Sequence, residues 1–85
     1  MTFAKIFDSE KHGQLLLKED VSEEGNPELR LYFQINGESV CSVALHFKDN
    51  EDGWKRADAA FAEFSLELAE DLMKSVPQEV FDLYK

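Results

Sequence analysis

The spacing of apolar residues changes once along this chain, and this change limits the possible folds more than any other feature. Up to about residue 47, apolar residues tend to recur at every second position, the period of a strand with one buried face. From about residue 53 they recur at intervals of three and four, the period of a helix that packs through one stripe. Several strands followed by a helix indicate an α+β domain with an antiparallel sheet.

Four segments carry the strand pattern, and turn-forming residues separate them. The clearest is 28–35, where leucine, phenylalanine and isoleucine alternate with polar residues and tyrosine. Asn36-Gly37 follows it and is typical of a hairpin turn. The predicted sheet therefore has three or four strands in meander order, drawn from the segments 3–7, 14–21, 28–35 and 39–47.

Two loop lengths are possible for the hairpin that contains Asn36-Gly37. A two-residue loop pairs Ile35 with Glu38 and sets the apolar face of one strand beside the weakly apolar face of the next. A three-residue loop pairs Leu31 with Cys41 and brings the two apolar faces together. Because a slip of one residue moves every side chain to the other face, the pattern favours the three-residue loop, with its glycine left-handed in a bulge.

A single long helix is predicted from about residue 53 to Val76, where Pro77 ends or kinks it. Asp52 or Asn50 is positioned to cap its amino terminus. The stripe expected to pack on the sheet contains Trp54, Ala57, Phe61, Phe64, Leu68 and Leu72. The predicted core combines this stripe with the strands and contains Leu29, Leu31, Phe33, Cys41, Val43, Leu45, Trp54, Phe61, Phe64 and Leu68.

The same helix carries a second apolar stripe, rotated from the first by about 120°. Its members are Ala59, Ala62, Leu66, Ala69 and Met73. One explanation is that a short terminal helix over 78–83, together with Phe81 and Tyr84, folds back over this stripe. The other is that Ala62, Leu66 and Met73 contact a second copy of the chain.

The charge balance excludes one common role of small domains. The 85 residues include 18 Asp and Glu but 9 Lys and Arg, a formal net charge of −9. Direct binding of nucleic acid needs clustered basic residues, and an acidic surface is repelled by anionic membranes. Hydrophobic residues make up 44% of the chain and aromatic residues 12%, which indicates one folded domain over 1–85 rather than a disordered acidic chain. One cysteine and no membrane-spanning apolar run indicate a cytoplasmic protein.

No residue pattern points to catalysis, a metal or a cofactor. The segment 49–53 resembles a calcium-binding loop in composition, but its glycine is fifth instead of sixth and no glutamate occupies the last ligand position. His12, His46 and Cys41 have no metal-binding spacing. Cys41 is expected to be a buried small hydrophobic residue. We therefore expect a protein that is not an enzyme and needs no cofactor.

Two acidic groups are candidate binding surfaces for a basic partner. The first is a row on the long helix, containing Glu63, Glu67, Glu70 and Asp71. The second is a cluster around the loop after the second strand, containing Glu19, Asp20, Glu23, Glu24 and Glu28. Carboxylates one helical turn apart are about 6 Å from each other, close to the spacing of phosphates on a nucleic-acid strand. The helix row is preferred because a rigid element loses little entropy on docking.

The sequence thus predicts a binding or inhibitor protein whose acidic surface docks a basic partner, plausibly at that partner's nucleic-acid-binding site. Compact acidic domains of this type are common among phage and mobile-element products that inhibit host machinery, which is an analogy of type rather than of motif. The alternative is a homo-oligomeric interaction module, in which the acidity serves only solubility. Either a monomer or a homodimer is compatible with the sequence.

Overall fold

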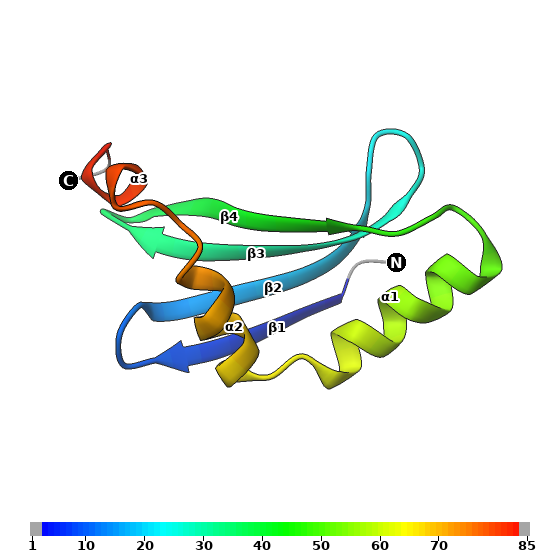
Figure 1. The fold of residues 1–85 in the computed structure, drawn as a ribbon, viewed down its shortest axis with the longest axis horizontal. Helices are drawn as coiled ribbons and strands as arrows, with labels where there is room; N and C mark the ends of the chain where they lie inside the picture. The colour runs from blue at the N-terminus through cyan, green and yellow to red at the C-terminus, as the bar shows by residue number, and fades with distance from the viewer. Residues whose placement is uncertain (1–2, 84–85) are drawn as a thin grey trace.

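The computed structural model describes residues 3–83. Four strands form one antiparallel sheet in the order β1-β2-β3-β4, and helices follow the last strand (Figure 1). The elements are β1 (Phe3–Ser9), β2 (Gly13–Val21), β3 (Pro27–Ile35), β4 (Glu38–His46), α1 (Glu51–Glu63), α2 (Leu66–Met73) and α3 (Gln78–Leu83). The α+β class and the meander order predicted from the sequence are confirmed.

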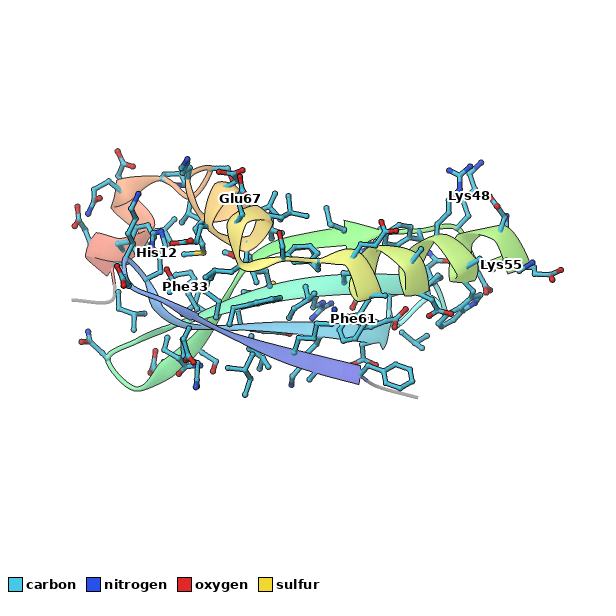
Figure 2. All side chains as sticks on the ribbon, turned by 90° about the horizontal axis from the view of Figure 1, so that it is seen from below. His12, Phe33, Lys48, Lys55, Phe61 and Glu67 are labelled. Carbon is cyan, nitrogen blue, oxygen red and sulfur yellow. The ribbon has the colours of Figure 1, made fainter. Side chains whose placement is uncertain are left out.

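The two longer helices, α1 and α2, lie on one side of the sheet, and no described element covers the other side (Figure 2). Alternate residues of β2 and β3 point toward the helices and are buried there, as the period-two pattern requires. The fully buried core contains Leu15, Leu17, Leu29, Leu31, Phe33, Phe64, Ala69 and Met73. The remaining strand residues form an uncovered face.

The hairpin between β3 and β4 has a two-residue turn, so the predicted three-residue loop is wrong. Ile35 pairs directly with Glu38. Asn36 and Gly37 both have positive φ, 51° and 79°, the combination that a type I′ hairpin turn requires. The positive φ of Gly37 is confirmed, but it arises from the turn itself and not from a bulge beside it.

A bulge inside β4 restores the apolar register that the two-residue turn would otherwise lose. Tyr32 pairs with Cys41, whereas the preceding residue, Leu31, pairs with Val43, so Ser42 is the extra residue. Its hydroxyl donates a hydrogen bond to the Leu31 carbonyl over 3.1 Å. The bulge returns Val43 to the helix side of the sheet. Cys41, expected in the core, is exposed on the uncovered face.

The predicted single helix over 53–76 is interrupted at Phe64 and Ser65. Phe64 has extended backbone angles, and the Ser65 side chain accepts a hydrogen bond from the Leu68 amide, which caps a new helix. Lys5 of β1 donates to the carbonyls of Phe61 and Ala62 over 2.5 and 2.9 Å, satisfying groups at the end of α1. In Figure 1 the two helices run in different directions from this break.

The break also explains why the sequence contains two apolar stripes. α1 packs through the first stripe, with Ala57 fully buried, whereas α2 packs through the second, with Ala69 and Met73 buried. Leu68, expected in the core, is turned outward and is 43% exposed. Met73 is therefore unavailable for self-association, because it belongs to the core of its own chain.

At the two ends of the helical segment, the structure agrees with the prediction from the sequence. Asn50 caps α1 by accepting a hydrogen bond from the Gly53 amide over 2.7 Å, as predicted. The terminal helix has the predicted bounds, and the Phe81 ring lies 5.1 Å from that of Phe33. Trp54, expected in the core, is only half-buried, and its indole N–H donates a hydrogen bond to Asp49 Oδ1 over 3.3 Å. Tyr84, also expected to cover the helix, lies outside the described residues.

Gly37→Val is expected to lower the free energy of unfolding by about 1–3 kcal/mol, since a β-branched residue resists a φ of 79°. No atom would lie within 4 Å of an added Cβ, so the backbone conformation alone is tested. Gly37→Asn is the matched control and should keep most of the stability, because asparagine tolerates this conformation. Urea unfolding of both variants provides the measurement; equal stability of the valine variant and the native protein would contradict the turn assignment.

Candidate functional site

A polar pocket opens at the end of the sheet where the β2–β3 loop meets the end of β4. It has a volume of about 530 Å³. Its lining residues come from the loop, from the start of β3 and from the last residue of β4: Ser22, Glu23, Glu24, Asn26, Glu28, Arg30 and His46. We call it the Glu28 pocket.

The loop that forms one wall of the pocket is closed by hydrogen bonds centred on Ser22. The Ser22 amide donates to the Asn26 carbonyl over 2.8 Å, and the Gly25 amide donates to the Ser22 carbonyl over 2.9 Å. The Asn26 amide donates to the Ser22 hydroxyl over 3.1 Å. Because this loop is a turn closed by hydrogen bonds, the entropy argument that favoured the rigid helix row applies to the loop as well.

Glu28 is the central side chain of the pocket. It lies on β3 on the uncovered face, opposite in direction to Leu29, yet its side chain is only 2% exposed. Its Oε1 atom is 2.7 Å from Arg30 Nε, and its Oε2 atom is 3.3 Å from His46 Nδ1. Oε2 nevertheless accepts no hydrogen bond of good geometry from residues 3–83. A buried carboxylate oxygen left without a donor is costly, by about 1–3 kcal/mol or more.

The other charged groups make the pocket acidic overall. A hydrogen bond with Tyr32, followed by the charge of Glu28, raises the pKa of the Arg30 guanidinium, which therefore stays charged and neutralises Glu28. Glu23 and Glu24 are exposed at the rim and form no ion pair with any residue in the described part of the chain. A cationic group entering the pocket would meet two unneutralised carboxylates and one orphan acceptor, beside Arg30 Nε, a buried donor that also lacks a hydrogen-bond partner among residues 3–83.

The structure divides the predicted helix row. Glu63 ends α1, whereas Glu67, Glu70 and Asp71 lie on α2 beyond the break. Two of the α2 carboxylates are already engaged. Glu70 accepts a hydrogen bond from the Ser9 hydroxyl over 2.9 Å, and Asp71 pairs with Lys74 over 3.1 Å. The row is therefore not the single rigid element that its sequence spacing suggested.

The predicted loop cluster is also divided. Glu23 and Glu24 lie at the pocket rim, and Asp20 is half-buried, with Oδ1 accepting a hydrogen bond from the Val21 amide over 2.8 Å. Glu19 is 3% exposed and faces α1, so its predicted place on the surface is wrong. The physical reason is the strand period: Glu19 follows Leu15 and Leu17 on the helix side of β2.

Glu19 and Asp58 form a carboxyl pair between β2 and α1. Burial, a side-chain hydrogen bond with Asp58 and the charge of Asp58 together raise the pKa of Glu19 from 4.5 to about 7. The second carboxyl oxygen of Glu19, Oε2, is buried and has no hydrogen-bond partner among residues 3–83. The contribution of this pair to stability therefore depends on pH.

Sequence reasoning placed Glu28 in the acidic loop cluster but missed its burial beside Arg30, and it missed the role of His46 in this pocket. The available signal was the alternation in β3, which places Glu28 and Arg30 together on the face opposite the core leucines. His46 pairs with Glu28 across β3 and β4, a contact that depends on the register of the hairpin. Among residues 3–83, no group of three histidine, cysteine or acidic side chains is arranged to hold a metal ion.

No protein-family model, curated protein or solved structure matches this chain. No helix within residues 3–83 is both long and apolar enough to cross a membrane. The candidate function therefore follows from the chemistry of the Glu28 pocket and from the distribution of charge over the molecule.

Proposed function

We propose that this domain is a non-enzymatic protein that binds a basic partner, and that a lysine or arginine side chain of the partner enters the Glu28 pocket. The observation that supports this most directly is the buried Glu28 Oε2 atom without a hydrogen bond, below two exposed carboxylates. A guanidinium or ammonium group supplies the missing donor. Hydrogen bonds that involve charged groups contribute about 1.5–3 kcal/mol each.

The rest of the molecule favours the same class of partner. Residues 51–83 carry nine carboxylates and three basic side chains, and the helices therefore give their side of the molecule a negative potential. Such a field speeds the association of a positively charged protein. The pocket then provides the contact that makes the encounter specific, because buried and desolvated contacts contribute more than those at a rim.

A nucleic-acid-binding protein fits this chemistry, since its binding surface is built from lysine and arginine. Occupying that surface would make the domain an inhibitor of the cytoplasmic machinery it binds, as in the analogy of type with phage products.

The proposal is tested by titrating the protein with tetra-arginine amide at low salt and following backbone amide signals by NMR. Glu23→Gln/Glu24→Gln is expected to weaken binding about 10-fold, because it removes the rim charge without touching the buried pair. Glu67→Gln/Glu70→Gln is the matched control, with the same change in charge on α2, and is expected to weaken binding less than twofold.

Two results would count against this assignment. An equal loss in both double variants would mean that net charge alone attracts the peptide. A larger loss in the α2 variant would return the binding surface to the helix row. Signal shifts confined to the residues of the pocket would support the proposal independently of affinity.

A further inference from the structure

The strand register arranges the side chains of the uncovered face in rows that cross the sheet. One row carries apolar or aromatic side chains from edge to edge: Ile6 pairs with Leu16, Leu16 with Tyr32, and Tyr32 with Cys41. The ammonium of Lys18, from the neighbouring row, lies 5.6 Å from the centroid of the Tyr32 ring. Ile6 is 60% exposed and Cys41 is exposed, while the two central residues are half-buried. We call these four residues the Ile6–Cys41 row. No described element packs on it (Figure 2).

The rows on either side differ in charge. One neighbouring row contains two cations between two small residues, in the paired order Ala4, Lys18, Arg30 and Ala44. The other contains the pairs Asp8–Gln14 and Gln34–Ser39, which are uncharged except for Asp8. The uncovered face thus carries a balance of charge, in contrast to the acidic helices on the opposite side of the molecule.

We propose that two copies of this chain pack through their uncovered faces, related by a two-fold axis along the Ile6–Cys41 row. This arrangement stacks the apolar row of one copy on that of the other. It places Lys18 and Arg30 opposite the row of the second copy that contains Gln14 and Gln34, so that no like charges face each other. Charge also opposes association through the helices, because two strongly acidic surfaces repel each other.

The same charges exclude the other symmetric stacking of two sheets. A two-fold axis along the strands would place Lys18 opposite Arg30 of the second copy. It would also place Asp20 opposite Glu28. Like charges directly opposed across an interface are unfavourable, so the pattern selects the axis along the row.

The area of the face predicts a weak dimer. Four strands about 4.8 Å apart, with nine residues rising about 3.3 Å each, cover roughly 19 by 30 Å. Two such faces bury on the order of 1,100 Å², slightly below the range of about 1,200–2,000 Å² for stable interfaces. The dimer should therefore form at high protein concentration and dissociate on dilution.

The Glu28 pocket lies at the rim of this interface, because Glu28 is four residues along β3 from Tyr32, about 13 Å away. The pocket and the interface share Arg30, whereas Glu23 and Glu24 line only the pocket and the Ile6–Cys41 row lies only in the interface. The dimer is a property of the chain alone, and its test needs no partner.

Cys41 provides a direct test because it is the one cysteine of the chain. The axis along the row places the two thiols opposite each other, within reach of a short bis-maleimide linker. A cross-linked dimer is expected at several hundred micromolar protein, with its yield falling steeply on dilution. With the axis along the strands, Cys41 would face Ile6 of the second copy, and the linker could not join the thiols.

Sedimentation velocity of charge-introducing variants provides the second test. Leu16→Lys and the more exposed Ile6→Lys should each abolish the dimer, the latter serving if the former fails to fold. Leu68→Lys on α2 is the matched control, 43% exposed in the native chain, and should leave the dimer intact. A native protein that stays monomeric at 1 mM, or a dimer lost only in the Leu68 variant, would overturn the proposal. Unchanged binding of tetra-arginine amide by monomeric Ile6→Lys would separate this result from the fate of the proposed function.

Discussion

Replacing Phe33 with alanine is expected to lower the free energy of unfolding by about 3–5 kcal/mol, the usual range for a buried phenylalanine. Phe33 is 2% exposed and pairs with Leu15 on one side and Val40 on the other. Its ring also lies 5.1 Å from that of Phe81, so it holds α3 against the sheet. Such a loss is a large part of the total stability of a domain this small.

Gln34→Ala is the control for Phe33→Ala, because the two residues are adjacent but point to opposite faces of β3. Gln34 is exposed and donates a hydrogen bond to the Ser39 hydroxyl over 2.5 Å. Its loss is expected to lower the free energy of unfolding by less than about 1 kcal/mol. Urea unfolding of both variants measures the difference. Similar losses in the two variants would mean that Phe33 does not point to the face of β3 that the helices bury.

Replacing Glu19 with glutamine is expected to stabilise the protein at pH 8, by at most about 3 kcal/mol. The pKa of Glu19 is about 7 in the folded protein, because burial and the neighbouring Asp58 disfavour its charge, against 4.5 for the ordinary side chain. Above pH 7 the folded protein therefore holds two facing carboxylates, one of them buried. Glutamine keeps the shape of the side chain and removes that charge.

The pH dependence of the native protein gives the sign of this effect. Between about pH 4.5 and 7 the folded state binds a proton at Glu19 that the unfolded state has lost. The contribution of Glu19 to the free energy of unfolding therefore falls as the pH rises through this window, and is constant above it. The docking of α1 on β2 is expected to be firmest in mildly acidic solution.

The measurement is urea unfolding from pH 5 to pH 8 for the native protein and for Glu19→Gln. Subtracting the two curves removes the contributions of all ionisable groups that the two proteins share. Glu67→Gln, on the exposed surface of α2, is the control and should reproduce the native curve. A glutamine variant that is less stable than the native protein at pH 8 would show that Glu19 ionises without penalty.

The features that the sequence predicted correctly are those set by neighbours along the chain. The strands follow from alternation, the position of the hairpin and the positive φ of Gly37 from the turn-forming pair Asn36-Gly37, and the cap at Asn50 from its own side chain. The bounds of α3 follow from Pro77, which cannot continue the preceding helix. Each of these is decided within a few residues, so tertiary contacts do not change it.

The bulge at Ser42 and the break before Ser65 were not predicted, because each reconciles a local preference with packing elsewhere. The two-residue turn is the better local structure, and the bulge then recovers the apolar register of β4. The break lets α1 and α2 bury different stripes, while Lys5 from β1 satisfies the carbonyls at the end of α1. Neither solution follows from the periodicity of one segment alone.

In the candidate site too, the sequence determined some features and the tertiary structure decided others. The sequence by itself determined that acidic residues gather after β2 and along the helices, since charge is a property of composition. Only the tertiary structure decided that Glu19 turns inward to Asp58, and that Glu28 is buried beside Arg30 and His46. Burial and hydrogen-bond partners come from chain segments that meet in space, and the strand register that brings them together was settled by packing of the core.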